Sequence, residues 1–234
     1  MQKKILIVLT NMEKYKNNEI PTGVWLGELI HFYEEIKNYG FEADFISPKG
    51  GYVPIDPYSM KFMSNIDYKW YGNNEFINKA LSNTLKPSDV KAEDYFAIYY
   101  TGGHGVLWDF PDNVEIQNIA MSIYNSGGYI LAVCHGVAGL LNIKNKDGEY
   151  LIKNKKITGF SDTEEFLSQK KNKVPFSTEL ELRKRGAIYN KKRFFKSYAI
   201  SDSRIITGQN PWSPKEVAKL LLDEINEDNK KVNK

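Results

Sequence analysis

Short apolar runs separated by polar stretches dominate the hydrophobic pattern of the chain. Three continuous apolar runs have the composition of strands that are buried on both faces of a parallel sheet. They lie at residues 3–10, 95–100 and 129–133. Three further segments, in which apolar positions recur at mostly helical spacing, lie at residues 24–38, 114–125 and 215–226. Strands that alternate with helices form βαβ units, so the pattern predicts an α/β fold with a mainly parallel sheet between layers of helices.

Shorter elements complete this pattern. Further strands are predicted at residues 41–47, 155–160, 194–200 and 204–207. Further helices are predicted at residues 74–84, 161–169 and 178–185. Residues rich in turn formers predict loops at 11–22 and 106–111, a polar turn region at 144–154, and an irregular excursion at 52–74. We expect that excursion to cover one end of the sheet.

A lone cysteine lies where the apolar run at 129–133 meets the segment that follows it. Ala132 and Gly136 stand two residues before and after Cys134, which is the spacing of a nucleophile elbow. A strand that turns sharply into a helix brings these flanking residues together, so only small side chains fit. Unpaired N–H groups and the helix dipole at a first helical turn favour a thiolate. The pattern predicts a reactive Cys134, with His135 as its partner base or proton donor.

Glycines at the end of the strand at 95–100 suit the same chemistry. An attacking thiolate leaves negative charge on the carbonyl oxygen of its substrate, so the site needs N–H donors aimed at that oxygen. Gly102 and Gly103 are candidates because glycine lets the backbone approach a ligand closely, and the N–H of His135 is another. The carboxyl ends of parallel strands meet at one edge of a sheet. We therefore expect this loop opposite Cys134, with His104 contacting the substrate or fixing the loop.

Four acidic residues are candidates for moving a proton or orienting the imidazole. Glu28 lies in an apolar stretch after the first loop, where partial burial favours its neutral form. It can then hold or shuttle a proton beside the thiol, whereas a surface position on an amphipathic helix is the alternative. Asp162, Glu164 and Glu165 begin the helix predicted at 161–169. The residues alone leave open which of these three orients the imidazole.

The composition narrows the classes of function. The 234 residues fit one large domain at residues 1–228, with a polar C-terminal tail at 229–234. A net charge of +3 with interspersed signs gives no reason to expect nucleic-acid or membrane binding, and no apolar run is long enough to cross a bilayer. A single cysteine fits the reducing cytoplasm. That cysteine and the three histidines form no metal-ligand spacing, so no metal is expected.

The order of the motifs resembles that of the ThiJ/PfpI superfamily, and within it the compact glutathione-independent glyoxalase (glyoxalase III) and chaperone-like branch. The motifs that carry the resemblance run nearly end to end, at residues 22–28, 47–51, 102–105, 132–136, 157–160 and 207–211. The resemblance implies a flavodoxin-like sheet sandwiched by helices, a fold shared with class I glutamine amidotransferases, and a homodimer. It places a catalytic triad at Cys134, His135 and Glu165, and a glutamate next to the thiol at Glu28.

The resemblance also implies an activity. Cys134 would add to a 2-oxoaldehyde such as methylglyoxal, and the hemithioacetal would rearrange to D-lactate without metal, nucleotide or glutathione. Relatives have holdase chaperone, protein deglycase and peptidase or amidase activities, which the sequence does not separate from this one. A holdase would use exposed aromatic residues, for which residues 52–71 and 194–195 are candidates, and core or dimer-interface packing is the alternative for them. Redox sensing by a low-pKa Cys134 is a further alternative.

Overall fold

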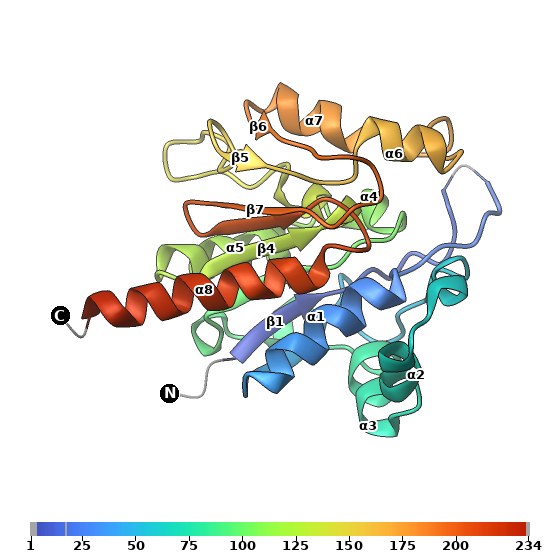
Figure 1. Cartoon of the computed structure of the whole chain (residues 1–234), viewed down its shortest axis with the longest axis horizontal. Helices are drawn as coiled ribbons and strands as arrows, with labels where there is room; N and C mark the ends of the chain where they lie inside the picture. Colours follow the sequence, from blue (N-terminus) through green and yellow to red (C-terminus); the bar gives the residue numbers. More distant parts are fainter. Residues whose placement is uncertain (1–3, 17, 233–234) are drawn as a thin grey trace.

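A six-stranded sheet forms the centre of the molecule, as Figure 1 shows. The computed structural model describes residues 4–16 and 18–232. The strands of this sheet are β1 (Lys4–Val8), β2 (Glu42–Ile46), β3 (Ala97–Tyr100), β4 (Tyr129–Val133), β7 (Ala199–Asp202) and β8 (Ile205–Gly208). Their order is β2-β1-β3-β4-β8-β7, and every pair is parallel except β7 with β8. The predicted mainly parallel α/β sheet is confirmed.

Helices surround this sheet. The α-helices are α1 (Leu26–Asn38), α2 (Asn65–Tyr71), α3 (Asn74–Ile77), α4 (Val106–Asp109), α5 (Val114–Asn125), α6 (Asp162–Leu167), α7 (Thr178–Lys184) and α8 (Pro214–Val232). Tighter 3₁₀ turns are η1 (Ser59–Phe62), η3 (Pro87–Asp89), η4 (Ala92–Asp94) and η5 (Cys134–Leu140), and η2 (Asn78–Ser82) is a π-helical turn. A separate pair of short parallel strands consists of β5 (Lys156–Ile157) and β6 (Ile188–Tyr189).

The two faces of the sheet bury two separate cores. Helices α1 and α8 lie side by side on one face, and α5 covers the other (Figure 1). Side chains alternate between the faces of a strand, so Ile5 and Ile7 pack in the core with α1 and α8, whereas Leu6 and Val8 pack in the core with α5. A strand that is buried on both sides needs a continuous apolar run. This is why residues 3–10 carry no polar alternation.

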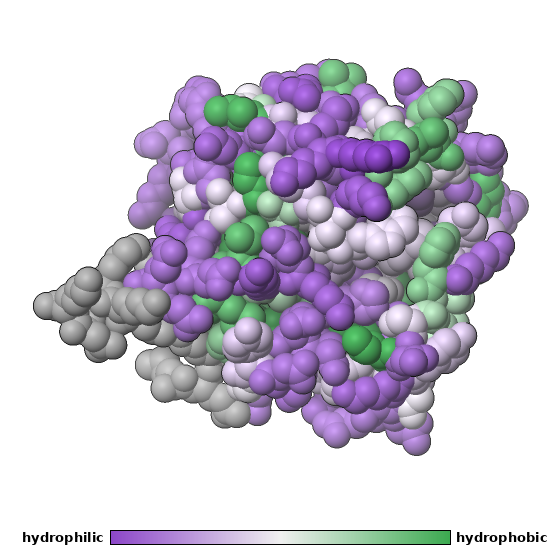
Figure 2. Space-filling model, in the orientation of Figure 1, coloured by the Kyte–Doolittle hydropathy of each residue, from purple (hydrophilic) through white to green (hydrophobic). Residues whose placement is uncertain are grey.

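The surface in Figure 2 is mainly hydrophilic, with hydrophobic residues in small separate patches on the face shown. This agrees with a chain whose apolar residues fill the two cores. Large apolar residues that stay exposed include several aromatic rings of the segment predicted to be an irregular excursion. They are Tyr52, Tyr58, Phe62, Tyr68 and Tyr71.

Several predicted elements differ from the observed ones. The excursion at residues 52–74 contains η1 and α2, and the loop predicted at 106–111 contains α4. Helix α2 begins at a capping box between Ser64 and Asp67, so hydrogen bonds at its end define it where no long apolar period does. The helix predicted at 74–84 is divided into α3 and η2.

Other differences concern the late strands and the chain ends. The strand predicted at 155–160 is only the two-residue β5, which pairs with β6 outside the central sheet. The strand predicted from residue 194 begins at Ala199, and α8 extends past the predicted end at 226 to Val232. The predicted strand start at Lys3 and residues 233–234 of the predicted tail lie outside the described residues. The division into domain and tail stays a prediction.

The carboxyl edge of the sheet brings together the three regions expected to meet there. The hydroxyl of Thr10, after β1, donates to Asp109 Oδ2 at 2.7 Å. The N–H of Trp25 donates to the carbonyl of Gly102 after β3 at 3.1 Å. A Cβ on Gly102 would lie 2.9 Å from Cβ of Cys134 after β4. The loops that carry the candidate residues are therefore packed against one another.

Candidate active site

The turn that carries Cys134 has the strained geometry of a nucleophile elbow. The backbone of Cys134 has a φ of +57°, which side-chain-bearing residues rarely adopt. A Cβ on Gly136 would lie 2.4 Å from the carbonyl oxygen of Tyr100. Only glycine fits at that position, as the spacing of small residues predicted. The N–H of Phe160 donates to the carbonyl of Cys134 at 3.2 Å and ties the elbow to the segment before α6.

The thiol, an imidazole and a carboxylate form a line from this turn. Cys134 Sγ lies 3.5 Å from His135 Nδ1, and His135 Nε2 lies 2.7 Å from Glu165 Oε2. His135 and Glu165, the other two members of this line, are both buried. A carboxylate can only accept a hydrogen bond, so Nε2 of His135 carries the proton and Nδ1 is left as an acceptor toward the thiol. Burial lowers the pKa of His135 despite the neighbouring Glu165. The ring is therefore neutral at pH 7, with its Nδ1 lone pair free to accept a proton.

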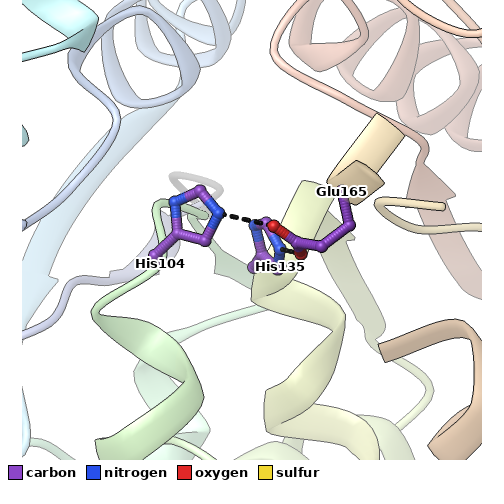
Figure 3. A group of neighbouring side chains, drawn as sticks. All are labelled: His104, His135 and Glu165. Carbon is purple, nitrogen blue, oxygen red and sulfur yellow. Dashed lines mark hydrogen bonds and ion pairs between the residues drawn. The ribbon is translucent and has the colours of Figure 1, made fainter. Parts of the chain in front are cut away.

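Glu165 also bonds a second imidazole. Its Oε1 lies 2.9 Å from His104 Nε2, and Figure 3 shows the Glu165 side chain reaching toward both rings. The ring centroids of His104 and His135 are 4.4 Å apart. Burial opposes ionisation of Glu165, but the two imidazoles outweigh burial and hold the pKa of this carboxyl well below its usual range. One ionised carboxylate thus fixes the orientation of both rings.

The cap of α6 explains why Glu165 rather than its neighbours reaches the imidazole. Ser161 caps the helix, and the Glu164 carboxylate returns to accept from the N–H and hydroxyl of Ser161 at 3.0 and 2.7 Å. The other oxygen of Glu164 accepts from the N–H of Phe195 and from Asn210 Nδ2, both at 2.8 Å. Asp162 points elsewhere and accepts from the hydroxyl of Ser177. Among the three candidates left open by the sequence, Glu165 alone contacts the histidine in the described structure.

Glu28 is fully buried beside the thiol. Its Oε2 accepts from the N–H of Gly102 at 2.8 Å, and its Oε1 has no hydrogen-bond partner among the described residues. Burial raises the pKa of Glu28 to about 8, against the opposing effects of the Cys134 thiol and the Gly102 amide. The group is therefore mainly neutral at pH 7. The alternative of a surface position on an amphipathic helix is wrong, because α1 turns Glu28 inward to the carboxyl edge of the sheet.

The prediction that the elbow favours a thiolate is also wrong. Burial and the acidic Glu28 raise the pKa of the Cys134 thiol well above its ordinary value, and the N–H of His135 opposes this shift without reversing it. The turn after Cys134 is a 3₁₀ segment and not the α-helix that was expected to supply a dipole. The resting side chain of Cys134 is therefore a thiol, and a reaction at its sulfur would need a neighbouring base to take the proton. The raised pKa does not support the alternative of redox sensing by a low-pKa cysteine.

The two glycines of the strand-end loop have different environments. The N–H of Gly102 donates a hydrogen bond to Glu28 Oε2. Gly103 has a φ of +105°, and a Cβ there would lie 2.1 Å from the carbonyl oxygen of Gly23, so the loop packs directly against the start of α1. The N–H of Gly103 makes no hydrogen bond within the described residues. Gly102 therefore positions Glu28, and Gly103 keeps a donor for a ligand.

A cleft of about 860 Å³ opens at Cys134, His135, His104 and Gly103. Aromatic residues that the sequence did not assign to the site line it, among them Phe160 and Trp212. Trp212 lies in the turn between β8 and α8, at the same edge of the sheet as the elbow. The rule that ligands bind beyond the carboxyl ends of parallel strands points to this turn but does not single out Trp212 within it.

Among the described residues, His104, His135 and Glu165 form a group whose possible ligand atoms all lie within 4.8 Å of one another. Two histidines and one carboxylate are a donor set that metals use. Each imidazole here already shares its Nε2 with a carboxylate oxygen at 2.7 or 2.9 Å. A metal ion would have to displace both hydrogen bonds, so the expectation of a metal-free site stays a prediction.

The fold and this line of thiol, imidazole and carboxylate define a class of protein. Residues 20–224 match the model of the DJ-1/PfpI family, and the chain belongs to this family. The resemblance to the ThiJ/PfpI superfamily is confirmed. No helix within residues 4–16 and 18–232 combines the length and apolar character that crossing a membrane requires.

Particular relatives are similar over nearly their whole length. Glyoxalase 3 of Candida albicans is 35% identical over 231 residues, which cover 94% of this chain and 97% of the relative. Glutathione-independent glyoxalase HSP31 of Saccharomyces cerevisiae is 35% identical over 233 residues with the same coverage. Among solved structures, glyoxalase III from Candida albicans matches with a TM-score of 0.83 at 32% identity, covering 95% of this chain and 97% of that one. Rapid Encystment Protein 24 KDa of Francisella tularensis matches with a TM-score of 0.90 at 39% identity, covering 94% and 97%.

Proposed function

We propose that this protein is a glutathione-independent glyoxalase that converts 2-oxoaldehydes such as methylglyoxal to 2-hydroxy acids such as D-lactate. The observation that carries the proposal is the placement of two proton-transfer groups, neutral His135 and neutral Glu28, next to one buried thiol. Isomerisation of a 2-oxoaldehyde needs a nucleophile and two such groups. The curated relatives named as glyoxalases support the same chemistry.

In the first step the Cys134 sulfur adds to the aldehyde carbon. His135 Nδ1 takes the thiol proton, which its tautomer allows because Nε2–H is held by Glu165. Glu28 gives its proton to the former aldehyde oxygen, and the N–H of Gly103 stabilises the charge that develops there. The product is a neutral hemithioacetal, with His135 protonated and Glu28 ionised. In this proposal Gly103 has the oxyanion role, because the N–H of Gly102 is used by Glu28.

The second step moves hydrogen between the two substrate carbons. The Glu28 carboxylate, whose pKa of about 8 makes it a stronger base than an ordinary carboxylate, removes the proton from the thiol-bearing carbon. His135 protonates the neighbouring ketone oxygen, which gives an enediol. Glu28 then returns its proton to the second carbon while His135 takes the proton of the first hydroxyl. The first carbon is oxidised and the second reduced, which leaves a thioester of the 2-hydroxy acid.

Water completes the cycle by hydrolysing the thioester. Glu28 takes a proton from the attacking water, and protonated His135 returns a proton to the departing Cys134 sulfur. The acid leaves, and Cys134, His135 and Glu28 regain their starting protonation states. The net reaction adds one water to the oxoaldehyde, and neither glutathione nor a redox cofactor takes part.

D-lactate formation from methylglyoxal by purified protein, measured without glutathione, tests this proposal. Cys134→Ala removes the nucleophile and Glu28→Gln removes the proton carrier, so we expect each to lower kcat by at least about 10²-fold. Glu115→Gln on the exposed surface of α5 is the matched control and keeps wild-type activity. Folded wild-type protein that forms no D-lactate would refute the proposal. Suppression of client aggregation by the inactive Cys134→Ala variant would then support the holdase alternative.

A further inference from the structure

The cleft at Cys134 is much larger than a three-carbon oxoaldehyde requires. Its volume of about 860 Å³ lies in the range of pockets that enclose ligands of roughly 300–1,000 Å³. Methylglyoxal, held at Cys134, would leave most of this space filled with water. The size of the cleft indicates that the second carbonyl of the substrate carries a larger substituent.

Aromatic rings form the walls of this space. The six aromatic residues that line it are Trp25, Tyr58, Phe62, Phe160, Phe195 and Trp212. Their rings make a chain of contacts, with centroids 5.8 Å apart for Trp25 and Phe62, 6.5 Å for Phe62 and Trp212, and 5.5 Å for Phe195 and Trp212. Phe62 is 50% exposed and Trp212 46% exposed. Ring surface is therefore uncovered where a ligand would lie.

The wall of Phe195 and Trp212 is held in place by a buried carboxylate. Glu164 accepts from the N–H of Phe195 and from Asn210 Nδ2, both at 2.8 Å. Asn210 Oδ1 in turn accepts from the N–H of Trp212 at 3.1 Å. Phe195 is kept at a φ of +54°, a conformation that needs such support. This wall is built by specific hydrogen bonds, so the cleft stays open instead of collapsing onto Cys134.

The turn that carries Tyr58 is held in the same way. Asp56 Oδ1 accepts from the N–H of Tyr58 at 2.8 Å, and Asp56 Oδ2 accepts from the hydroxyl of Thr22 at 3.2 Å. Both oxygens of Asp56 therefore already accept hydrogen bonds from the protein. The two lysines that line the cleft, Lys61 and Lys170, bring positive charge to it. This charge disfavours cationic substituents, and the aromatic rings of the cleft offer packing surface to an aromatic substituent.

From these observations we infer that the site takes 2-oxoaldehydes with an aromatic substituent, which packs against the contacting rings of Phe62 and Trp212 while the aldehyde reaches Cys134. This inference rests on the proposed function and names its substrate class. Burial of an aromatic ring is expected to raise kcat/KM for phenylglyoxal at least about tenfold above that for methylglyoxal. Edge and face contacts between rings favour phenylglyoxal over cyclohexylglyoxal, which has similar size without a π-system.

The test compares these three oxoaldehydes in wild type, Trp212→Ala, Phe62→Ala and the control Tyr68→Ala. Tyr68 is an aromatic residue of α2 that is 62% exposed and does not line the cleft. We expect the phenylglyoxal to methylglyoxal ratio of kcat/KM to fall about fivefold or more in the two wall variants and to stay at the wild-type value in Tyr68→Ala. Turnover of methylglyoxal without a preference for phenylglyoxal, or a ratio that the wall variants leave unchanged, would overturn the inference but not the proposed function.

Binding of the reaction products distinguishes a failure of the inferred aromatic subsite from a failure of the proposed function. Mandelate and D-lactate, the acids expected from phenylglyoxal and methylglyoxal, are titrated calorimetrically into wild-type protein. We expect mandelate to bind at least about tenfold more tightly, and Trp212→Ala to remove this difference. No turnover of any oxoaldehyde would refute the proposed function, and the aromatic subsite would then stand on mandelate binding alone. Equal binding of the two acids overturns the subsite whatever the kinetics show.

Discussion

The variant Glu28→Gln gives a direct test of the electrostatics of the site. Its effect is measured as a change in the free energy of unfolding with pH and does not depend on any assumed activity. The folded pKa of Glu28 is about 8, against an ordinary value of 4.5. A folded pKa above the unfolded one means that the folded state binds the proton more tightly. Stability is then lost as the pH rises from about 4.5 through about 8. The amide of the variant does not titrate, so the variant lacks this loss.

The magnitude follows from the two pKa values. Between them each pH unit lowers the free energy of unfolding by about 1.4 kcal/mol, and the slope falls to half at pH 8. From pH 6 to pH 8 the wild type should therefore lose about 2 kcal/mol relative to Glu28→Gln. Any fixed penalty of placing an amide against the thiol is the same at both pH values and cancels in this comparison.

Urea unfolding at pH 6, 7 and 8 and at one protein concentration measures the effect. Glu165→Gln is the matched control, because Glu165 is a buried glutamate of the same site with its pKa well below the usual range. That carboxyl is ionised in both states throughout this pH window, so the difference between wild type and Glu165→Gln should stay nearly constant between pH 7 and 8. The comparison is made there because loss of Glu165 also lowers the pKa of His135, which changes stability near the ordinary pKa of histidine. A wild-type minus Glu28→Gln difference that is equally flat would refute the neutral, buried Glu28.

Three further outcomes follow from the site. Glu165→Gln should lower kcat/KM for methylglyoxal by about 10²–10⁴-fold, because an amide cannot accept from both imidazoles and the tautomer of His135 is no longer fixed. A fall of less than tenfold in folded protein would contradict this role. The pH profile of kcat/KM should decline above about pH 8, where Glu28 ionises, and at acid pH only below the ordinary pKa of histidine, because burial lowers the pKa of His135. A profile that rises continuously through pH 9 would show that Glu28 is not the proton carrier. Dialysis against EDTA should leave kcat/KM unchanged, since the carboxylate of Glu165 already bonds both imidazoles, whereas loss of activity that Zn²⁺ restores would reveal a metal enzyme.

The features that sequence reasoning predicted correctly depend on local sterics and on the alternation of side chains between the two faces of each strand. Gly136 had to be small because the backbone of the neighbouring strand lies 2.4 Å from where its Cβ would be. The runs that form β1, β3 and β4 are buried on both faces, as is the shorter β8. The edge where the loops meet follows from parallel pairing, which is why Glu28, His104 and Cys134 could be grouped in advance.

What the sequence did not predict depends on burial and on long-range hydrogen bonds. The pKa of Cys134 depends on how completely Glu28 and the surrounding chain exclude water, and a motif carries no measure of that. The choice between Glu164 and Glu165 depends on the phase of α6, which the capping box with Ser161 sets. Trp212 was missed because its role comes from ring contacts with Phe62 and Phe195, which are distant from it in the chain.

The two adjacent glutamates of α6 have a consequence for engineering and evolution. In the proposed mechanism Glu165 orients the base His135, and Glu164 accepts from the N–H of Phe195 in the aromatic wall, so one short helix supports both parts. A shift of α6 would change turnover and substrate preference together, whereas substitutions at Phe62 or Trp212 leave the hydrogen bonds of Glu165 intact. New specificities are therefore accessible through the rings of the wall, and a library that varies α6 would mostly sample enzymes impaired in both properties.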